Sequence, residues 1–310
     1  MLARIAQELF WLGRNLARAE ATARLLEGVF QADLQGRPDE ASATRLGWDS
    51  LTHIMGGARK GEVPAQRDAV LDALTSDADN PASVVACVAR AREGAQAVRD
   101  VISAEMWEAI NTTHLRLRDG DLAGTRLASG PYSIYQHVKE RSALFWGLTA
   151  RTMLRDEASA FLSAGGRIES GDMVLRMLRV ALPAGDAGDS ADGQAIALLQ
   201  AVGGFQAYRR AVPAPAHAKP VARFLLFERS YPDSVAAAVD SLNNALKVAD
   251  ALPRSSEPIL RLSRLSADLE FRRSAEGDAD LRVTCQEVQR ELGLVDADIA
   301  QRYFGGARAA

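Results

Sequence analysis

The sequence predicts an all-α fold, a helical bundle built from two diverged copies of one helical unit. Apolar residues recur every three to four positions almost throughout the chain, which is the period of an α-helix. No convincing segment alternates between apolar and polar residues, as a half-buried strand does. Three separated segments recur in the same order about 150 residues later, which predicts the duplication.

The first predicted helix is long and amphipathic. Its apolar residues run from Ile5 to Phe30 in steps of three and four, so they form one stripe along a single face. Gly36 and Pro38 interrupt the pattern and end the helix near residue 35. The same periodicity predicts further helices, in order, over residues 40–56, 64–75, 81–98, 103–118, 131–157, 158–182, 193–211, 219–229, 232–250, 255–275 and 281–303.

The internal repeat makes the chain one predicted domain, 1–310, whose halves span about 1–157 and 158–310. We expect an approximate twofold axis between the halves. Sites in helical bundles form between facing helices, so we expect a shared pocket at the seam between the halves. The recurring segments are Leu16-x-x-x-Glu20-x-x-x-Arg24-x-Leu26 with Ile168-x-x-x-Asp172-x-x-x-Arg176-x-Leu178 (a shift of 152), Gly56-Gly57 with Gly203-Gly204 (147), and Asn80-Pro81-Ala82-Ser83-Val84 with Tyr231-Pro232-Asp233-Ser234-Val235 (151).

Charged side chains accompany the apolar stripe of the first helix. At about 100° per residue, Glu8 falls inside the stripe and Glu20 lies on its edge. Arg14 and Arg18 point to the other side of the helix. The carboxylates of Glu8 and Glu20 are therefore not simply exposed to solvent.

Glu20 and Arg24 have the four-residue spacing of a helix-surface ion pair, and the second copy repeats the pair as Asp172 and Arg176. Such a pair has two interpretations. It locks helix packing, which is the usual role of charges at the margin of an apolar stripe. Alternatively, it presents a guanidinium and an acid to the carboxylate and amine of a ligand.

A second charged run contains Arg92, Glu93 and Arg99. These residues share a segment with several valines and are candidates for facing the charged first helix, although a solvated helix face explains them equally well. Ser103 is a good N-cap for the next helix, and Glu105 in its first turn suits the helix dipole. Helix initiation therefore accounts for both without any function.

Composition excludes several classes of partner and location. A net charge of −3 leaves no basic footprint for nucleic acid. No window approaches 18 uninterrupted apolar residues, so no membrane span is predicted. The two cysteines, Cys87 and Cys285, are too few for a disulfide framework or a zinc site and fit a reducing compartment. Because the N-terminus also reads as a structural helix and not as a signal peptide, we expect a cytoplasmic protein.

Motifs for metals and cofactors are missing from the sequence. None of the four histidines follows a Glu by three positions, so the Glu-x-x-His pairs of di-iron bundles are absent. The chain also contains no His-Glu-x-x-His, no glycine-rich dinucleotide or Walker-type phosphate motif and no esterase elbow. We therefore predict no metal site and no cofactor, and the sequence identifies no catalytic residue.

The charged segments resemble the bacterial alpha-E domain family, and the similarity covers most of the chain. The most specific part is the opening, residues 4–20 and 23–26, which contains Gly13-Arg14-x-x-x-Arg18-x-Glu20. The other similar blocks are residues 91–111, 145–149 with 165–172, 208–210, 224–226 and 232–235.

Three positions depart from the family pattern, which has an acid at Ala17, an Arg at Ser170 and usually an Arg at Asp233. Three charges expected at the family's site are therefore lost or reversed, which is typical of a diverged paralogue. The ligand-binding candidates that the charged runs and the similar blocks supply are Glu8, Arg14, Arg18, Glu20, Arg92, Glu93, Arg99, Glu105, Asn111, Glu169 and Asp172.

The resemblance to the alpha-E family implies which proteins this chain works with, but it does not imply that the chain catalyses a particular reaction. Alpha-E proteins are associated with circularly permuted ATP-grasp amide ligases, and with transglutaminase-like proteins, in systems that make or process small peptides. It implies that this chain is a non-catalytic or accessory component that binds a ligase partner, a peptide or both.

Two alternative functions stay open. One is an enzyme of amide or amino-acid chemistry that uses Glu8, Glu20 and Asp172 at the seam as acid, base or charge clamp. The other is a purely structural scaffold, in which the charged groups pair with one another and leave no cavity. We expect Arg14, Glu20, Arg92 and Glu105 to converge on a solvent-connected pocket. If these side chains instead close on one another, the scaffold alternative is favoured.

Overall fold

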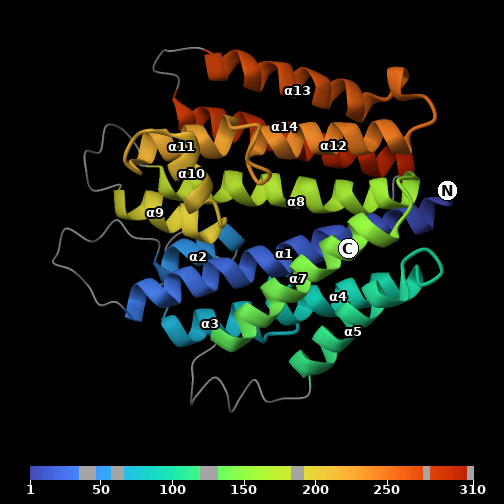
Figure 1. Cartoon of the computed structure of the whole chain (residues 1–310), viewed down its shortest axis with the longest axis horizontal. Coiled ribbons are helices and arrows are strands. Elements are labelled where there is room, and N and C mark those ends of the chain that lie inside the picture. Colours follow the sequence, from blue (N-terminus) through green and yellow to red (C-terminus); the bar gives the residue numbers. More distant parts are fainter. Residues whose placement is uncertain (35–46, 57–65, 119–131, 183–191, 275–279, 306–310) are drawn as a thin grey trace.

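The computed structural model describes residues 1–34, 47–56, 66–118, 132–182, 192–274 and 280–305 (Figure 1). These residues form α-helices and one short 3-10 helix and contain no strand, so the all-α prediction is confirmed. Over the same ranges, no helix combines the length and the apolar character that a membrane crossing requires. The elements are, in order, α1 (Ala3–Leu34), α2 (Trp48–Met55), α3 (Arg67–Thr75), α4 (Val84–Ala97), α5 (Ala104–Arg118), α7 (Tyr132–Thr152), α8 (Glu157–Ala181), α9 (Asp192–Ala201), α10 (Phe205–Ala211), α11 (Ala218–Phe227), α12 (Val235–Ala249), η3 (Pro253–Ser255), α13 (Glu257–Ser274) and α14 (Leu281–Tyr303).

Helices α1 and α8 pack against each other at the centre of the molecule (Figure 1). On one side α4 packs on α1 and α5 packs on α4, whereas on the other side α12 packs on α8 and α13 packs on α12. Helix α7 crosses α1, and α14 contacts both α8 and α1. The two central helices are therefore covered from several directions.

Two glycines let α1 and α8 approach closely. A Cβ added to Gly13 would lie 2.1 Å from the carbonyl oxygen of Leu162, and one added to Gly165 would lie 1.8 Å from the carbonyl oxygen of Phe10. Both distances are far below any real Cβ contact, so only glycine fits at these positions. The close approach brings the side chains of the flanking turns of both helices together, and it thereby positions the site described below.

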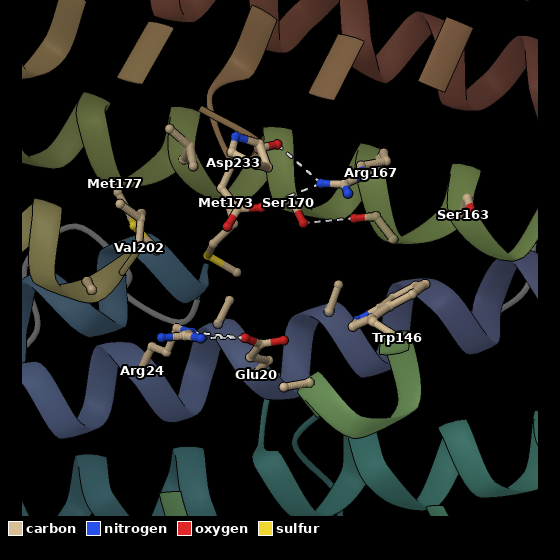
Figure 2. A pocket seen from close by; sticks show the side chains of 17 residues that line it. Glu20, Arg24, Trp146, Ser163, Arg167, Ser170, Met173, Met177, Val202 and Asp233 are labelled. Atoms are coloured by element: carbon tan, nitrogen blue, oxygen red, sulfur yellow. Dashed lines mark hydrogen bonds and ion pairs between the residues drawn. The ribbon is translucent and has the colours of Figure 1, made fainter. Parts of the chain in front are cut away.

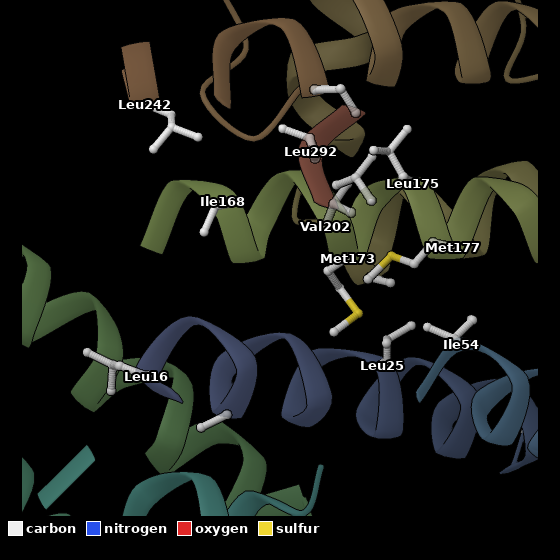
Figure 3. Close-up of a cluster of buried hydrophobic side chains, with 14 of the residues drawn as sticks. Leu16, Leu25, Ile54, Ile168, Met173, Leu175, Met177, Val202, Leu242 and Leu292 are labelled. Atoms are coloured by element: carbon white, nitrogen blue, oxygen red, sulfur yellow. The ribbon is translucent and has the colours of Figure 1, made fainter. Parts of the chain in front are cut away.

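The core is one continuous apolar cluster that extends to both sides of α8 (Figure 3). Leu25 of α1 and Met173 of α8 meet in the layer between the central helices, while Leu242 of α12 and Leu292 of α14 lie on the other side of α8. A helix that is buried on several faces needs apolar residues around much of its circumference. This explains why α8 lacks the clear single stripe that α1 shows in the sequence.

Several helix boundaries differ from the predicted ones because local capping decides them. The predicted helix 193–211 is two helices, since Gly203 adopts a φ of 69° and ends α9. The predicted helix 131–157 ends at Thr152, and Asp156 caps α8 by accepting hydrogen bonds from the backbone of its first turn. The predicted beginnings of helices 40–56, 64–75 and 131–157 lie outside the described residues.

Ser83 and Ser234 cap α4 and α12 with the same set of hydrogen bonds. Each hydroxyl accepts a bond from the backbone N–H three residues ahead, at 3.1 Å in both cases. Each also donates to the carbonyl oxygen six residues back, at 2.5 Å from Ser83 and 2.6 Å from Ser234. Both side chains are fully buried, so each ties its helix start to the preceding loop.

We expect Ser83→Ala and Ser234→Ala each to lower the free energy of unfolding by about 1–2 kcal/mol, because a buried cap is lost and a carbonyl oxygen loses its partner. Urea unfolding at equilibrium measures the change. Exposed Ser255, replaced by Ala, is the control and is expected to stay within about 0.5 kcal/mol. Equal stabilities for all three variants would contradict a capping role.

Candidate functional site

A buried ion-pair cluster joins α1 to α8 beside the glycine contact. Glu169 of α8 is 1% exposed and accepts bonds from two arginines of α1. Its Oε2 lies 3.0 Å from Nε of Arg14, and its Oε1 lies 2.6 Å from Nε of Arg18. A second bond of 3.0 Å runs from Nη2 of Arg18 to Oε2 of Glu169, which makes the contact bidentate.

Arg14 extends the cluster to α14. Its Nη1 donates to both carboxylate oxygens of Asp296, at 2.8 and 2.9 Å. Its guanidinium also lies 4.9 Å from the ring centroid of Trp11, a distance typical of a cation–π contact. Two arginines and two carboxylates therefore balance one another, and the cluster links the three helices that meet there.

The cluster holds its groups in their charged forms. Burial by itself would raise the pKa of Glu169, but the adjacent Arg14 and Arg18 outweigh it, so the pKa of this carboxyl lies below its usual value. Burial by itself would lower the pKa of Arg18, yet Glu169 outweighs it and raises that pKa above its usual value. Glu169 therefore remains an ionised pairing group at neutral pH and is unsuited to proton transfer.

A pocket of about 360 Å³ lies between α1 and α8 (Figure 2). Trp146 of α7 lies at one side of it, and Met177 and Val202 lie at the opposite side. Its volume falls near the lower end of the range of about 300–1,000 Å³ for ligand pockets. The lining residues are Ala17, Glu20, Ala21, Arg24, Ala143, Trp146, Ser163, Gly166, Arg167, Ser170, Met173, Val174, Met177, Ala201, Val202, Pro232 and Asp233.

The polar groups of the pocket come from both central helices. Nε and Nη2 of Arg24 both donate to Oε1 of Glu20, at 3.0 and 2.8 Å, as the four-residue spacing predicts. On the α8 side, Arg167 donates to the carbonyl oxygen of Pro232 at 3.2 Å and lies 3.6 Å from the carboxylate of Asp233. The pocket thus has an apolar interior with two neutralised charge pairs along its wall.

The three positions at which the resemblance predicts a different charge lie in this pocket. Ala17, Ser170 and Asp233 all line it. The hydroxyl of Ser170 donates to the carbonyl oxygen of Gly166 in its own helix, at 3.0 Å. The carboxylate of Asp233 faces the guanidinium of Arg167 on α8.

The predicted convergence of Arg14, Glu20, Arg92 and Glu105 on one pocket is wrong. Glu20 alone of the four lines the pocket, while Arg14 is buried in the ion-pair cluster. Arg92 donates to Asn111 of α5 at 2.8 Å, and Glu105 is exposed. Sequence spacing placed these residues on particular helix faces, but it did not predict which helix packs against each face.

The other candidates are spread over the helical layers. Glu8 lies beside α4, where its Oε2 would be 3.6 Å from a Cβ at Gly94. The carboxylate of Asp172 accepts a 2.7 Å bond from Gln289 of α14 and pairs with Arg176 at the same distance. Glu93 is exposed.

Arg99 is exposed as well, and its guanidinium lies 4.8 Å from the ring centroid of Trp107. Arg92 lies 5.5 Å from the same ring. Trp107 is half-buried and packs against the core, so these two arginines cover its ring on the outer side of the molecule.

Three important residues were not among the sequence candidates: Asp296, Trp146 and Arg167. Asp296 lies on α14, far along the chain from Arg14, and no motif connects the two positions. Trp146 and Arg167 did fall within the similar blocks, but only their packing identifies them as pocket residues. In the described part of the chain, no group of three or more His, Cys, Asp or Glu side chains is arranged to hold a metal ion.

The chain matches the model of the Alpha-E family, a predicted alpha-helical domain with a conserved ER motif, over residues 1–304. It is 27% identical over 314 aligned residues to an uncharacterised protein of Mycobacterium tuberculosis and 26% identical to one of Mycobacterium bovis. These alignments cover 96% of this chain but 35% of each relative, so the chain spans about a third of their length. No solved structure matches at a significant level. Since the family model covers nearly the whole sequence, the chain belongs to the Alpha-E family.

Proposed function

We propose that this chain is a non-catalytic binding component of an ATP-grasp-linked system that forms amide bonds in small peptides. In this role it binds the ligase, and the pocket between α1 and α8 receives a peptide. The observation that carries the proposal is the pocket itself, which combines an apolar interior with the Glu20–Arg24 pair. An apolar cavity with a few convergent polar groups is the usual form of a small-ligand site.

The charged motif supports a binding role over a catalytic one. Arg14, Arg18 and Glu169 neutralise one another in a buried cluster, which is a means of fixing two helices together. The three carboxylates of the enzymatic alternative lie against different parts of the molecule, because Glu8 is beside α4 and Asp172 is bonded to α14, whereas Glu20 lines the pocket. They are not arranged as one acid–base set.

We also propose that the two charged helices are equivalent elements of a duplicated unit. The contacts of Gly13 with Leu162 and of Gly165 with Phe10 are reciprocal, since Phe10 and Leu162 are themselves 152 residues apart. The matching hydrogen bonds of Ser83 and Ser234 support the same relation at a shift of 151. In this interpretation, the α1–α8 contact is the seam between the halves.

The family resemblance supports the choice of partner, and the greater length of the relatives is consistent with a module that works beside other domains. A transglutaminase-like protein is the second partner that we propose.

Burial raises the pKa of both thiols, Cys87 and Cys285, to about 12, so they behave as inert core residues. Two reduced core thiols fit the cytoplasm, where we propose that the system acts.

Co-purification tests the proposed function. The chain is produced together with a circularly permuted ATP-grasp ligase from the same organism, and we expect a stable complex and a change in the rate of amide formation when the chain is left out. The transglutaminase-like protein is tested separately in the same way. Absence of a complex together with an unchanged ligase rate would overturn the proposal.

A further inference from the structure

The two sides of the α1–α8 contact are filled differently. On one side, Arg18 of α1 and Glu169 of α8 form the bidentate ion pair. A shift of 152 residues, which relates the two charged helices, carries Arg18 to Ser170 and carries Ala17 to Glu169. The positions that correspond to the ion pair are therefore Ala17 of α1 and Ser170 of α8, and both line the pocket.

If the two charged helices are copies of one unit, as proposed above, the pocket lies where a second ion pair would stand. Ala17 and Ser170 have shorter side chains than the Glu and Arg that stand at the corresponding positions, and they line the same cavity from α1 and α8. A change on one wall alone would leave an unpaired buried charge, which is strongly destabilising. Because Ala17 and Ser170 are both short and uncharged, neither leaves an unpaired charge, and an apolar cavity remains between the helices.

The side chains around this space favour an amphipathic occupant. Trp146, Met173 and Met177 supply an aromatic face and two flexible thioethers, which adapt to apolar groups of different shape. Glu20 lies on the α1 wall at the same cavity. Both bonds from Arg24 go to its Oε1, so its Oε2 has no bond from any side chain that the structure describes and is available to a donor.

We propose that the pocket binds the N-terminal residue of a short peptide, with the ammonium group on Oε2 of Glu20 and an apolar side chain against Trp146, Met173 and Met177. This inference rests on the proposed function for the choice of a peptide, and it adds the chemical class that the pocket selects. A free amino acid shares this chemistry, so the test compares both.

Calorimetric titration of the isolated chain tests the proposal. The probes are L-phenylalanyl-L-leucine, its N-acetylated form and free L-phenylalanine. We expect the unmodified dipeptide to bind at least about tenfold more tightly than the acetylated one, because acetylation removes the charged donor. Tighter binding of free phenylalanine would assign the pocket to amino acids and overturn the peptide assignment.

Two variants form a matched pair, since they change carboxylates at corresponding positions of the two helices. Glu20→Gln is expected to weaken dipeptide binding about tenfold or more and to leave the acetylated dipeptide unaffected. Asp172→Asn, which alters the carboxylate that faces Gln289, is expected to leave both affinities unchanged. Equal effects of the two variants would contradict the assignment of Glu20.

The double variant Ala17→Glu/Ser170→Arg tests the origin of the cavity. We expect the new side chains to pair across it and to abolish dipeptide binding, while circular dichroism retains the helical spectrum. Full binding by the folded double variant would overturn the proposal, and if this variant does not fold, the Glu20→Gln titration still decides. A chain that binds no probe but forms the ligase complex would leave the proposed function standing and refute this inference alone.

Discussion

Glu169→Gln is expected to lower the free energy of unfolding by about 3 kcal/mol, because it removes the negative charge that compensates two buried arginines. Arg14 keeps Asp296 as a partner, so the uncompensated charge falls mainly on Arg18. The Arg18 side chain retains 19% exposure, which lets water reach it and places the loss at the lower end of the usual 3–5 kcal/mol for a broken buried pair. Urea unfolding at pH 7 measures the difference.

The effect of Glu169→Gln should also depend on pH. The pKa of Glu169 is lower in the folded chain than in the unfolded one, so the ion pair stabilises the fold above the unfolded pKa of about 4.3. This contribution disappears as the pH falls through the folded pKa. We therefore expect wild type and variant to approach each other in stability below about pH 4.

Asp172→Asn on the same helix is the control, because its partly exposed pair with Arg176 is expected to contribute about 1 kcal/mol or less. A loss for Glu169→Gln no larger than that of the control would contradict a stabilising role for the buried cluster.

Gly165→Ala is expected to destabilise the chain by about 3 kcal/mol or to prevent folding, which is the upper end of the effect of overpacking. The added Cβ would lie 1.8 Å from the carbonyl oxygen of Phe10, and this backbone atom cannot move aside as a flexible side chain would. The central helices would have to separate, which would weaken both the ion-pair cluster and the core. Thermal and urea unfolding measure the loss, and Gly13→Ala is expected to behave similarly.

Gly28→Ala provides the matched control for the glycine variants. Gly28 also lies in α1, but no atom lies within 4 Å of an added Cβ. Alanine is favoured over glycine in a helix, so this variant is expected to gain up to about 1 kcal/mol. Similar losses at Gly28 and Gly165 would mean that the close helix approach is not the reason for glycine at position 165.

The helices were predictable because their signals are local. Apolar spacing gave α1 and α14 their extents, and the glycines at 203–204 mark where the predicted helix 193–211 divides in two. The spacing of apolar residues continues on both sides of these glycines, so the spacing alone predicted one helix. The contact of Gly165 with Phe10 could not be predicted, because it depends on how α1 and α8 pack.

The candidate site was only partly predictable because its partners are distant in sequence. The Glu20–Arg24 pair follows from a four-residue spacing, and it is present. The bonds from Arg14 to Glu169 and Asp296 span 155 and 282 residues, and they depend on how whole helices pack. Helical periodicity correctly separated Arg14 and Arg18 from the apolar stripe, but that other side of α1 is a second buried face and not a surface.

Methionine methyl resonances show directly whether the cavity between α1 and α8 is a binding site. Met173 and Met177 line the cavity, whereas exposed Met1 and buried Met106 lie elsewhere in the fold. In a chain labelled with carbon-13 at the methionine methyl groups, titration with L-phenylalanyl-L-leucine is predicted to shift the resonances of Met173 and Met177 and to leave those of Met1 and Met106 in place. Unchanged resonances for Met173 and Met177 at a high excess of dipeptide would mean that the cavity does not bind it.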